Sequence, residues 1–142
     1  MIFQFHSQDT IISILIRLIT RGKFNHVSIR SGKYVYEAHI GKGVIKTLYS
    51  KWDNSTVVEC IEIKSKREKE VVKFLNQQVG KKYDLTGIIA FLSIFAKPRN
   101  GYWYCSELAM VAFAKLFGCD GEIQNQKISP QLFHDIIEIK RK

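Results

Sequence analysis

Three side chains in this sequence have the types needed for a cysteine-nucleophile site: Cys105, His26 and Glu37. In such a site the thiolate attacks a carbonyl carbon, the histidine transfers the proton, and a carboxylate orients the imidazole ring. The chemistry would be cleavage of an amide or an ester through an acyl-thioester on the cysteine. Whether the three groups can meet depends on the elements that carry them.

His26 and Glu37 lie on the two arms of a predicted β-hairpin. In NHVSIRSGKYVYEAH, residues 25–39, β-branched and aromatic residues alternate with polar ones on both sides of Ser31-Gly32, which we interpret as a two-residue turn. This turn pairs His26 directly with Glu37, and the Cβ atoms of opposed residues lie roughly 4.5–5.5 Å apart. The register therefore predicts a hydrogen bond from imidazole to carboxylate. His39 shares the strand face of Glu37 and is the alternative third residue.

Cys105 is predicted at the start of a helix that ends at Gly118. Between Leu108 and Phe117 only Lys115 is charged, so we expect this helix to be buried nearly all round. Free backbone N–H groups and the helix dipole stabilise a thiolate at such a position, where thiol pKa values fall from about 8.5 to roughly 3.5–7.5. The same N–H groups could stabilise an oxyanion.

Other polar and aromatic residues near this cysteine have competing interpretations. Tyr102 and Tyr104 flank it, and either hydroxyl could donate to an oxyanion or contact substrate, although a tyrosine there is equally a core residue. Cys60 and Cys119 have no base nearby in the sequence, and we interpret both as structural. The sequence gives no role to His6 or His134.

The composition predicts one globular domain over residues 1–142, with 46% hydrophobic and 25% charged residues. The formal net charge of +9 favours contact with an anionic polymer, whether cell-wall material, a lipid surface or nucleic acid. The three cysteines have no CxxC spacing, so they indicate neither a disulfide framework nor a zinc site. We expect no metal and no cofactor, and the oligomeric state stays open.

Two apolar runs raise the question of a membrane segment. IISILIRLI carries Arg17 in its middle, and LTGIIAFLSIFA, residues 85–96, is shorter than the roughly twenty residues that span a bilayer. We expect both to be buried helices, and no signal peptide is recognisable at the N-terminus. The default expectation is a reducing, cytoplasmic location, with action outside the producing cell left open.

The remaining pattern predicts an α+β domain in which an antiparallel sheet packs against the Cys105 helix. Besides the hairpin, strands are expected near residues 2–5, 44–46, 56–63 and 136–139, and helices near 8–20, 66–79 and 84–98.

The chain resembles the circularly permuted NlpC-type, papain-like cysteine hydrolases, the YiiX-like group. The similarity covers nearly the whole chain and rests on ordered segments: NHVSI, GKYVYEA, GKGVIKTLYSKW, GKKYDLTG, YWYCSEL and ISPQLF. Permutation in that family puts the histidine before the cysteine, as here. The resemblance implies a papain-like α+β core with a thiolate at Cys105, a base at His26 and a polar third residue at Glu37.

The leading expectation is therefore a thiol peptidase or amidase, and the resemblance implies a peptide bond such as one in a peptidoglycan stem peptide. A second class is similar to the lecithin:retinol acyltransferase branch of the permuted group, which transfers or hydrolyses lipid acyl chains. A third class is a non-catalytic basic module that binds nucleic acid or a partner. We rank it last, because a binder needs no aligned nucleophile and base.

Overall fold

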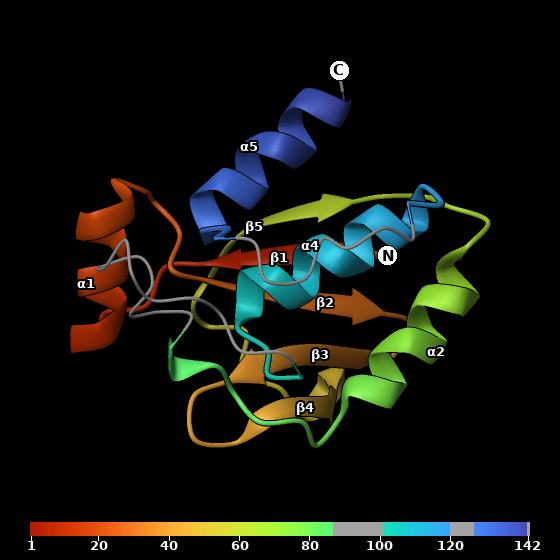
Figure 1. The fold of residues 1–142 in the computed structure, drawn as a ribbon, viewed down its shortest axis with the longest axis horizontal. Helices are drawn as coiled ribbons and strands as arrows, with labels where there is room; N and C mark the ends of the chain where they lie inside the picture. The colour runs from red at the N-terminus through yellow and green to blue at the C-terminus, as the bar shows by residue number, and fades with distance from the viewer. Residues whose placement is uncertain (87–100, 120–126, 142) are drawn as a thin grey trace.

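A computed structural model describes residues 1–86, 101–119 and 127–141 of the chain (Figure 1). Within these ranges the fold is α+β, as predicted, with a five-stranded antiparallel sheet and four α-helices. In chain order the elements are β1 (Ile2–His6), α1 (Ile11–Thr20), β2 (His26–Ser31), β3 (Tyr34–His39), β4 (Gly43–Leu48), the 3-10 turn η1 (Tyr49–Lys51), β5 (Val57–Glu62), α2 (Glu68–Gln78), α4 (Cys105–Leu116) and α5 (Pro130–Arg141).

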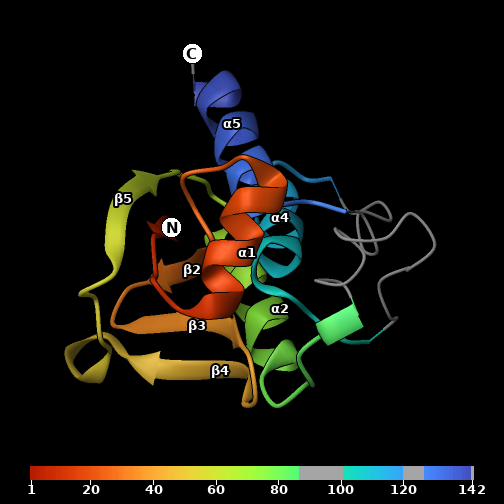
Figure 2. The ribbon, with the colours of Figure 1, turned by 90° about the vertical axis from the view of Figure 1, so that its left-hand side faces the viewer.

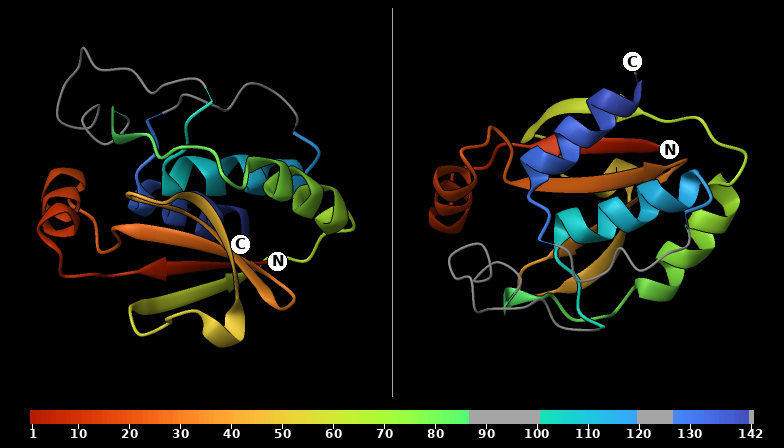
Figure 3. Two further views of the ribbon diagram at one scale, coloured as in Figure 1. Left: turned by 90° about the horizontal axis from the view of Figure 1, so that it is seen from below. Right: turned by 45° about the horizontal axis from the view of Figure 1, so that its top comes forward.

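The sheet has the order β4-β3-β2-β1-β5, and every neighbouring pair is antiparallel. Helices α2, α4 and α5 lie over one face of the sheet, whereas α1 stands beyond the end where β1 finishes (Figure 1, Figure 2 and Figure 3). Both β2 and α4 begin at that end (Figure 1). The topology therefore brings the first residue of β2 near the first residue of α4.

Alternation along β1 separates an apolar core from a polar layer. Phe3 is fully buried, and its ring packs edge-on against Phe113 of α4 and Phe133 of α5 at centroid distances of 5.9 and 5.4 Å. Gln4 and His6 alternate with the phenylalanines and so leave from the opposite face, yet they are buried as well. The sheet thus has a hydrophobic face under the helices and a buried polar layer behind it.

Helix α4 is the central helix of the fold. Nine of its twelve residues are buried, which confirms the prediction of a helix buried nearly all round. Ala109 and Ala112 are fully buried, and such small residues allow a helix to approach a sheet closely. Its N-cap residue, Tyr104, has an extended backbone and makes no side-chain capping hydrogen bond. No N-cap side chain therefore competes for the N–H groups of the first turn.

The β2–β3 hairpin differs from its predicted register. Ser31 pairs with Tyr34 and Ile29 pairs with Tyr36, so the turn residues are Gly32-Lys33 and not Ser31-Gly32. The reason is the backbone of Gly32, whose φ of 54° puts the glycine at the first central position of the turn. The pairing moves by two residues, and because strand side chains alternate with period two, the faces are unchanged. His26 and Glu37 are therefore diagonal neighbours on one face, not directly opposed residues.

The predicted strand at residues 136–139 is wrong, because this segment belongs to α5. A short apolar run fits a helix and a strand equally well, and tertiary contacts decide between them. Phe133 and Ile137, four residues apart, are both fully buried. Pro130 occupies the first helical position, and the Ser129 hydroxyl accepts the N–H of Leu132 at 3.1 Å, as at a helix start.

A helix over residues 136–139 leads to a prediction of stability that a strand there would not. Ile137 is 0% exposed and Ile139 is 75% exposed, although both would share one face of a strand. We expect Ile137→Ala to lower the free energy of unfolding by about 2–5 kcal/mol. Ile139→Ala should change it by less than about 0.5 kcal/mol. Chemical denaturation of both variants measures this difference, and equal losses would contradict the assignment.

Parts of two predicted segments lie outside the described residues. The helix expected at 84–98 is described only at its start, where the Asp84 carboxylate accepts a hydrogen bond from the Thr86 hydroxyl at 2.5 Å. Most of the apolar run over 85–96 and of the loop after Cys119 is likewise outside. Among the residues that the structure describes, no helix has both the length and the apolar character needed to cross a bilayer.

Candidate active site

Cys105 is the first residue of α4 and is buried against the start of β2. Its sulfur accepts hydrogen bonds from the His26 side chain and from the backbone N–H groups of Val27 and Ser106. Burial raises the pKa of the thiol, but the positive charge of His26 and these hydrogen bonds outweigh burial, so the pKa falls below its usual value. The site therefore favours a thiolate.

His26, the first residue of β2, links the cysteine to a carboxylate. Its Nε2 lies 2.8 Å from Oε2 of Glu37, which leaves Nδ1 as the nitrogen for the thiol. Burial lowers the pKa of His26, but the charge and hydrogen bond of the Cys105 thiolate, and then those of Glu37, raise it to about 10. The lowered pKa of Cys105 and the raised pKa of His26 therefore both favour a thiolate–imidazolium pair.

Both oxygens of the Glu37 carboxylate are occupied. Oε2 accepts from His26, and Oε1 accepts from the indole N–H of Trp52 at 3.0 Å. Burial raises the pKa of Glu37, but the hydrogen bonds and charge of these neighbours lower it to about 2. The carboxylate is thus ionised and fixed, which is what an orienting residue requires.

His39, the alternative third residue, is placed differently. It ends β3, is exposed, and donates its Nδ1–H to the carbonyl oxygen of Ile40 at 2.6 Å. Glu37 holds the imidazole of His26, and His39 only lines the neighbouring cavity. The geometry therefore favours Glu37, and not His39, as the residue that joins Cys105 and His26 in the candidate site.

The two tyrosines beside the cysteine differ in environment. Tyr104 is fully buried, and its hydroxyl accepts the backbone N–H of Ile128 at 3.1 Å. This contact ties the segment before α5 to the start of α4, a structural role that the hydroxyl fills already. Tyr102 is half-buried in the segment before α4.

Tyr83 is a further hydroxyl near the thiolate that sequence reasoning missed. A parallel bridge pairs it with Trp103, two residues before the cysteine. Burial raises its pKa well above the ordinary range, and the negative charges of Cys105 and Asp84 raise it further. A protonated tyrosine close to the Cys105 thiolate can donate to a negatively charged oxygen. The signal in the sequence, a tyrosine before Asp84, did not indicate this proximity.

His6 forms a second layer behind His26, and sequence reasoning gave it no role. The two imidazole rings lie 4.9 Å apart. The ring nitrogens of His6 contact the hydroxyls of Thr56 and Ser28, each at 3.0 Å. Burial, and then the charge on His26, lower the pKa of His6 to about 3, so it stays neutral. The polar alternation of Gln4 and His6 in β1 was the available signal.

A cavity of about 310 Å³ opens beside His26. Thr10, the N-cap residue of α1, and Ser13 and Ile16 of that helix line one side, and Tyr83 and His39 also line the cavity. A carbonyl group that enters this cavity can therefore approach the imidazole between α1 and the end of the sheet. The volume fits a few residues of peptide or part of an acyl chain.

Comparison of the chain with protein-family models, with curated proteins and with solved structures found no match in any of the three.

Proposed function

We propose that the protein is a cysteine hydrolase with Cys105 as nucleophile, His26 as base and Glu37 as orienting residue. The observation that carries this proposal is the position of one imidazole, which hydrogen-bonds a cysteine at a helix start and, at 2.8 Å, a buried carboxylate. A structural histidine or a structural buried cysteine does not require this three-part arrangement.

In the acylation step the thiolate of Cys105 attacks the carbonyl carbon and forms a tetrahedral oxyanion. We assign the stabilisation of that negative charge to the N–H groups at the start of α4 and to the hydroxyl of Tyr83, whose pKa is raised by burial and by the charge of Cys105. The imidazolium of His26 then donates its proton to the leaving nitrogen or oxygen as the bond to carbon breaks. An acyl-thioester on Cys105 and a neutral imidazole remain.

In the deacylation step neutral His26 takes a proton from water, and the oxygen of that water attacks the thioester. Collapse of the second tetrahedral intermediate breaks the carbon–sulfur bond, which releases the acid and restores the thiolate–imidazolium pair. Glu37 accepts no proton in either step, because its carboxylate, with a pKa of about 2, serves only to hold and charge-balance the imidazole.

A peptide bond, such as one in a peptidoglycan stem peptide, is the substrate we favour. The resemblance to permuted papain-like hydrolases supports it, and so does the net charge of +9, which would attract anionic wall polymers. The arrangement of α4 on an antiparallel sheet, with the histidine strand before the cysteine helix in the chain, fits the same proposal for the fold.

A lipid acyl ester is the second candidate, and α1 is the observation that favours it. Ile11 and Leu18 of this helix are 80% and 69% exposed, while Ser13 and Ile16 line the cavity beside His26. An exposed apolar helix next to a catalytic cavity could contact lipid, and the basic protein would be attracted to anionic headgroups.

Trapping of the acyl group on Cys105 tests these proposals. The full chain is mixed with muropeptides or with phosphatidylcholine–phosphatidylglycerol vesicles, quenched in acid, and analysed by peptide mass spectrometry. We expect a peptidyl adduct on Cys105 and none in Cys105→Ala. A fatty-acyl adduct instead would select the lipid hydrolase. Salt-dependent retention on nucleic acid without any adduct would contradict both and favour a binding module.

A further inference from the structure

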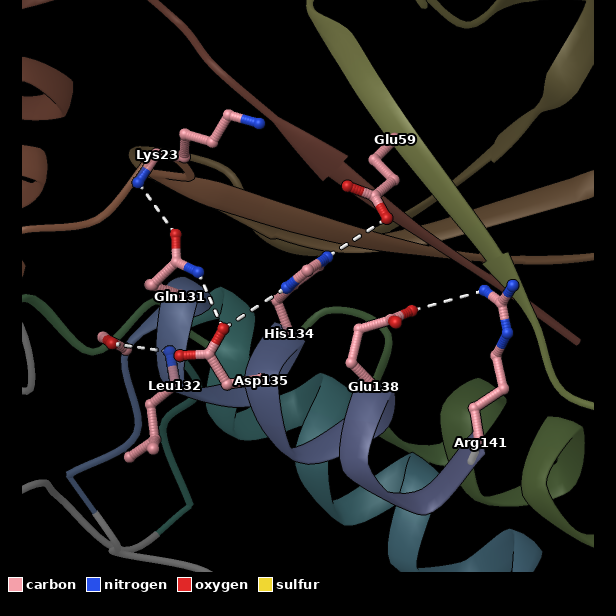
Figure 4. Close-up of polar contacts among 9 residues, drawn as sticks. Lys23, Glu59, Gln131, Leu132, His134, Asp135, Glu138 and Arg141 are labelled. Atoms are coloured by element: carbon pink, nitrogen blue, oxygen red, sulfur yellow. Dashed lines mark hydrogen bonds and ion pairs between the residues drawn. The ribbon is translucent and has the colours of Figure 1, made fainter.

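A second group of ligand-type side chains lies where α5 packs against the edge strand β5. His134 and Glu138 are four residues apart on one face of α5, and Glu59 reaches them from β5 (Figure 4). One ligand atom from each of the three lies within 4.8 Å of the others. None of these residues belongs to the Cys105 site, so a ligand bound here would be independent of the proposed function.

The imidazole of His134 is held in place by aromatic rings. Its ring centroid lies 4.9 Å from that of Phe5 and 4.7 Å from that of Phe24. Packing on both rings leaves the imidazole little rotational freedom, and its side chain is only 14% exposed. The imidazole of His134 is therefore a preorganised ligand-type group and not a mobile surface side chain.

The two ring nitrogens of His134 face carboxylates. Nδ1 lies 3.5 Å from Oδ1 of Asp135, and Nε2 lies 3.2 Å from Oε1 of Glu59. Nε2 is buried and makes no hydrogen bond of acceptable geometry. If Nδ1 carries the proton toward Asp135, the lone pair of Nε2 meets a carboxylate, which is repulsive unless a cation lies between them.

The distance between two of the three ligand atoms fits a metal ion in that position. Zinc binds imidazole nitrogen at about 2.0–2.1 Å and carboxylate oxygen at about 2.0–2.2 Å, which places two tetrahedral ligands roughly 3.3 Å apart. The 3.2 Å between Nε2 of His134 and Oε1 of Glu59 agrees with this spacing. Glu138 pairs with Arg141 at 3.3 Å, an exposed contact of small energy that leaves its second oxygen for a metal.

We propose that Glu59, His134 and Glu138 bind one divalent transition-metal ion of the Zn²⁺ type, with a water as fourth ligand. An imidazole in the donor set favours zinc over magnesium or calcium, which prefer oxygen ligands alone. Asp135 would orient the imidazole from behind, as outer carboxylates do in such sites. The ion would join α5 to the edge of the sheet and cover β5.

A Zn²⁺ titration of the metal-free full chain in competition with a chromogenic chelator tests this proposal. It is done in a Cys105→Ala background, because a thiolate beside an imidazole can itself bind zinc. We expect one ion per chain, at least tenfold weaker binding for Glu59→Gln and for Glu138→Gln, and about 10- to 100-fold weaker binding for Asp135→Asn. Glu62→Gln, the same change elsewhere on β5, should bind like the background protein.

Absence of saturable binding, or equal binding by all variants, would overturn the proposal and leave a protonated His134 paired with Glu59. X-ray absorption of the zinc-loaded Cys105→Ala protein gives a second measurement that does not depend on the folding of the Glu59, Glu138 and Asp135 variants. Nitrogen and oxygen ligands that include one imidazole would support the site. Sulfur ligation, from Cys60 or Cys119, would overturn it.

Discussion

Alkylation of Cys105 by iodoacetamide is expected to be fast and nearly independent of pH between about pH 6 and pH 8.5. The thiolate exists above the lowered pKa of Cys105, and the imidazolium that stabilises it persists up to the pKa of His26 near 10. In His26→Ala the cation is gone, and burial opposes only the backbone N–H groups of Val27 and Ser106, so the reaction should accelerate only near the ordinary thiol pKa of about 8.5 or above it.

The expected size of this effect at pH 6 is a loss of rate of about tenfold or more. A thiol with a pKa of 8.5 is only about 0.3% ionised at that pH, and the lower nucleophilicity of a low-pKa thiolate offsets part of the advantage of the intact pair. Peptide mass spectrometry of label against time and pH gives the rate for each cysteine separately. Cys60 and Cys119 are free and exposed, and their labelling should not depend on His26.

His39→Ala is the matched control for His26→Ala. It removes a histidine that lines the same cavity but donates to Ile40 instead of contacting the thiol. Its Cys105 alkylation rate should stay within about twofold of the wild type at every pH. If the two variants slow alkylation equally, or if wild-type Cys105 reacts only near pH 8.5, the thiolate–imidazolium pair does not exist.

Glu37→Gln is expected to lower the acylation rate with a chromogenic acetate ester by roughly 10²-fold. The carboxylate is ionised throughout the working range, since its pKa is about 2, and it contributes to the raised pKa of His26. Glutamine keeps the shape but removes the charge. The imidazole of His26 should therefore lose its proton at a lower pH, which proton NMR titration of the histidine signals measures directly.

Trp52→Phe is expected to lower the acylation rate less than Glu37→Gln does. The phenyl ring keeps most of the packing but removes the indole N–H that donates to Oε1 of Glu37 at 3.0 Å. Loss of one hydrogen bond to a charged group predicts a smaller decrease, about tenfold. Glu62→Gln, which removes an exposed charge from β5, should change neither rate nor titration. An unshifted His26 titration in Glu37→Gln would show that the carboxylate does not orient the base.

Much of the candidate site could be predicted from local patterns. The alternation in residues 25–39 was enough to put His26 and Glu37 on one strand face, because the period of two survives a register error of two residues. The apolar composition after Cys105 was enough to bury α4 and to put the cysteine at its start. In both cases the residues that set the position of the side chain belong to the same element or to its neighbour in the chain.

At two places the local pattern fits two structures equally well. The run at residues 136–139 fits both periodicities, and only the packing of Phe133 and Ile137 under the sheet selects the helix. The turn of the hairpin lies one residue from its predicted place, because Ser31-Gly32 and Gly32-Lys33 both offer a glycine, and pairing across the whole β2–β3 ladder decides between them.

The sequence by itself determined which residues could be nucleophile, base and orienting group, and which faces of their elements they occupy. These properties follow from backbone periodicity, which neighbouring residues set. The tertiary structure alone decided that Trp52 donates a hydrogen bond to Glu37, that the ring of His6 packs against the ring of His26, and that Tyr83 lies near Cys105. Those contacts join segments far apart in the chain, and their geometry depends on how the whole sheet and α4 pack together.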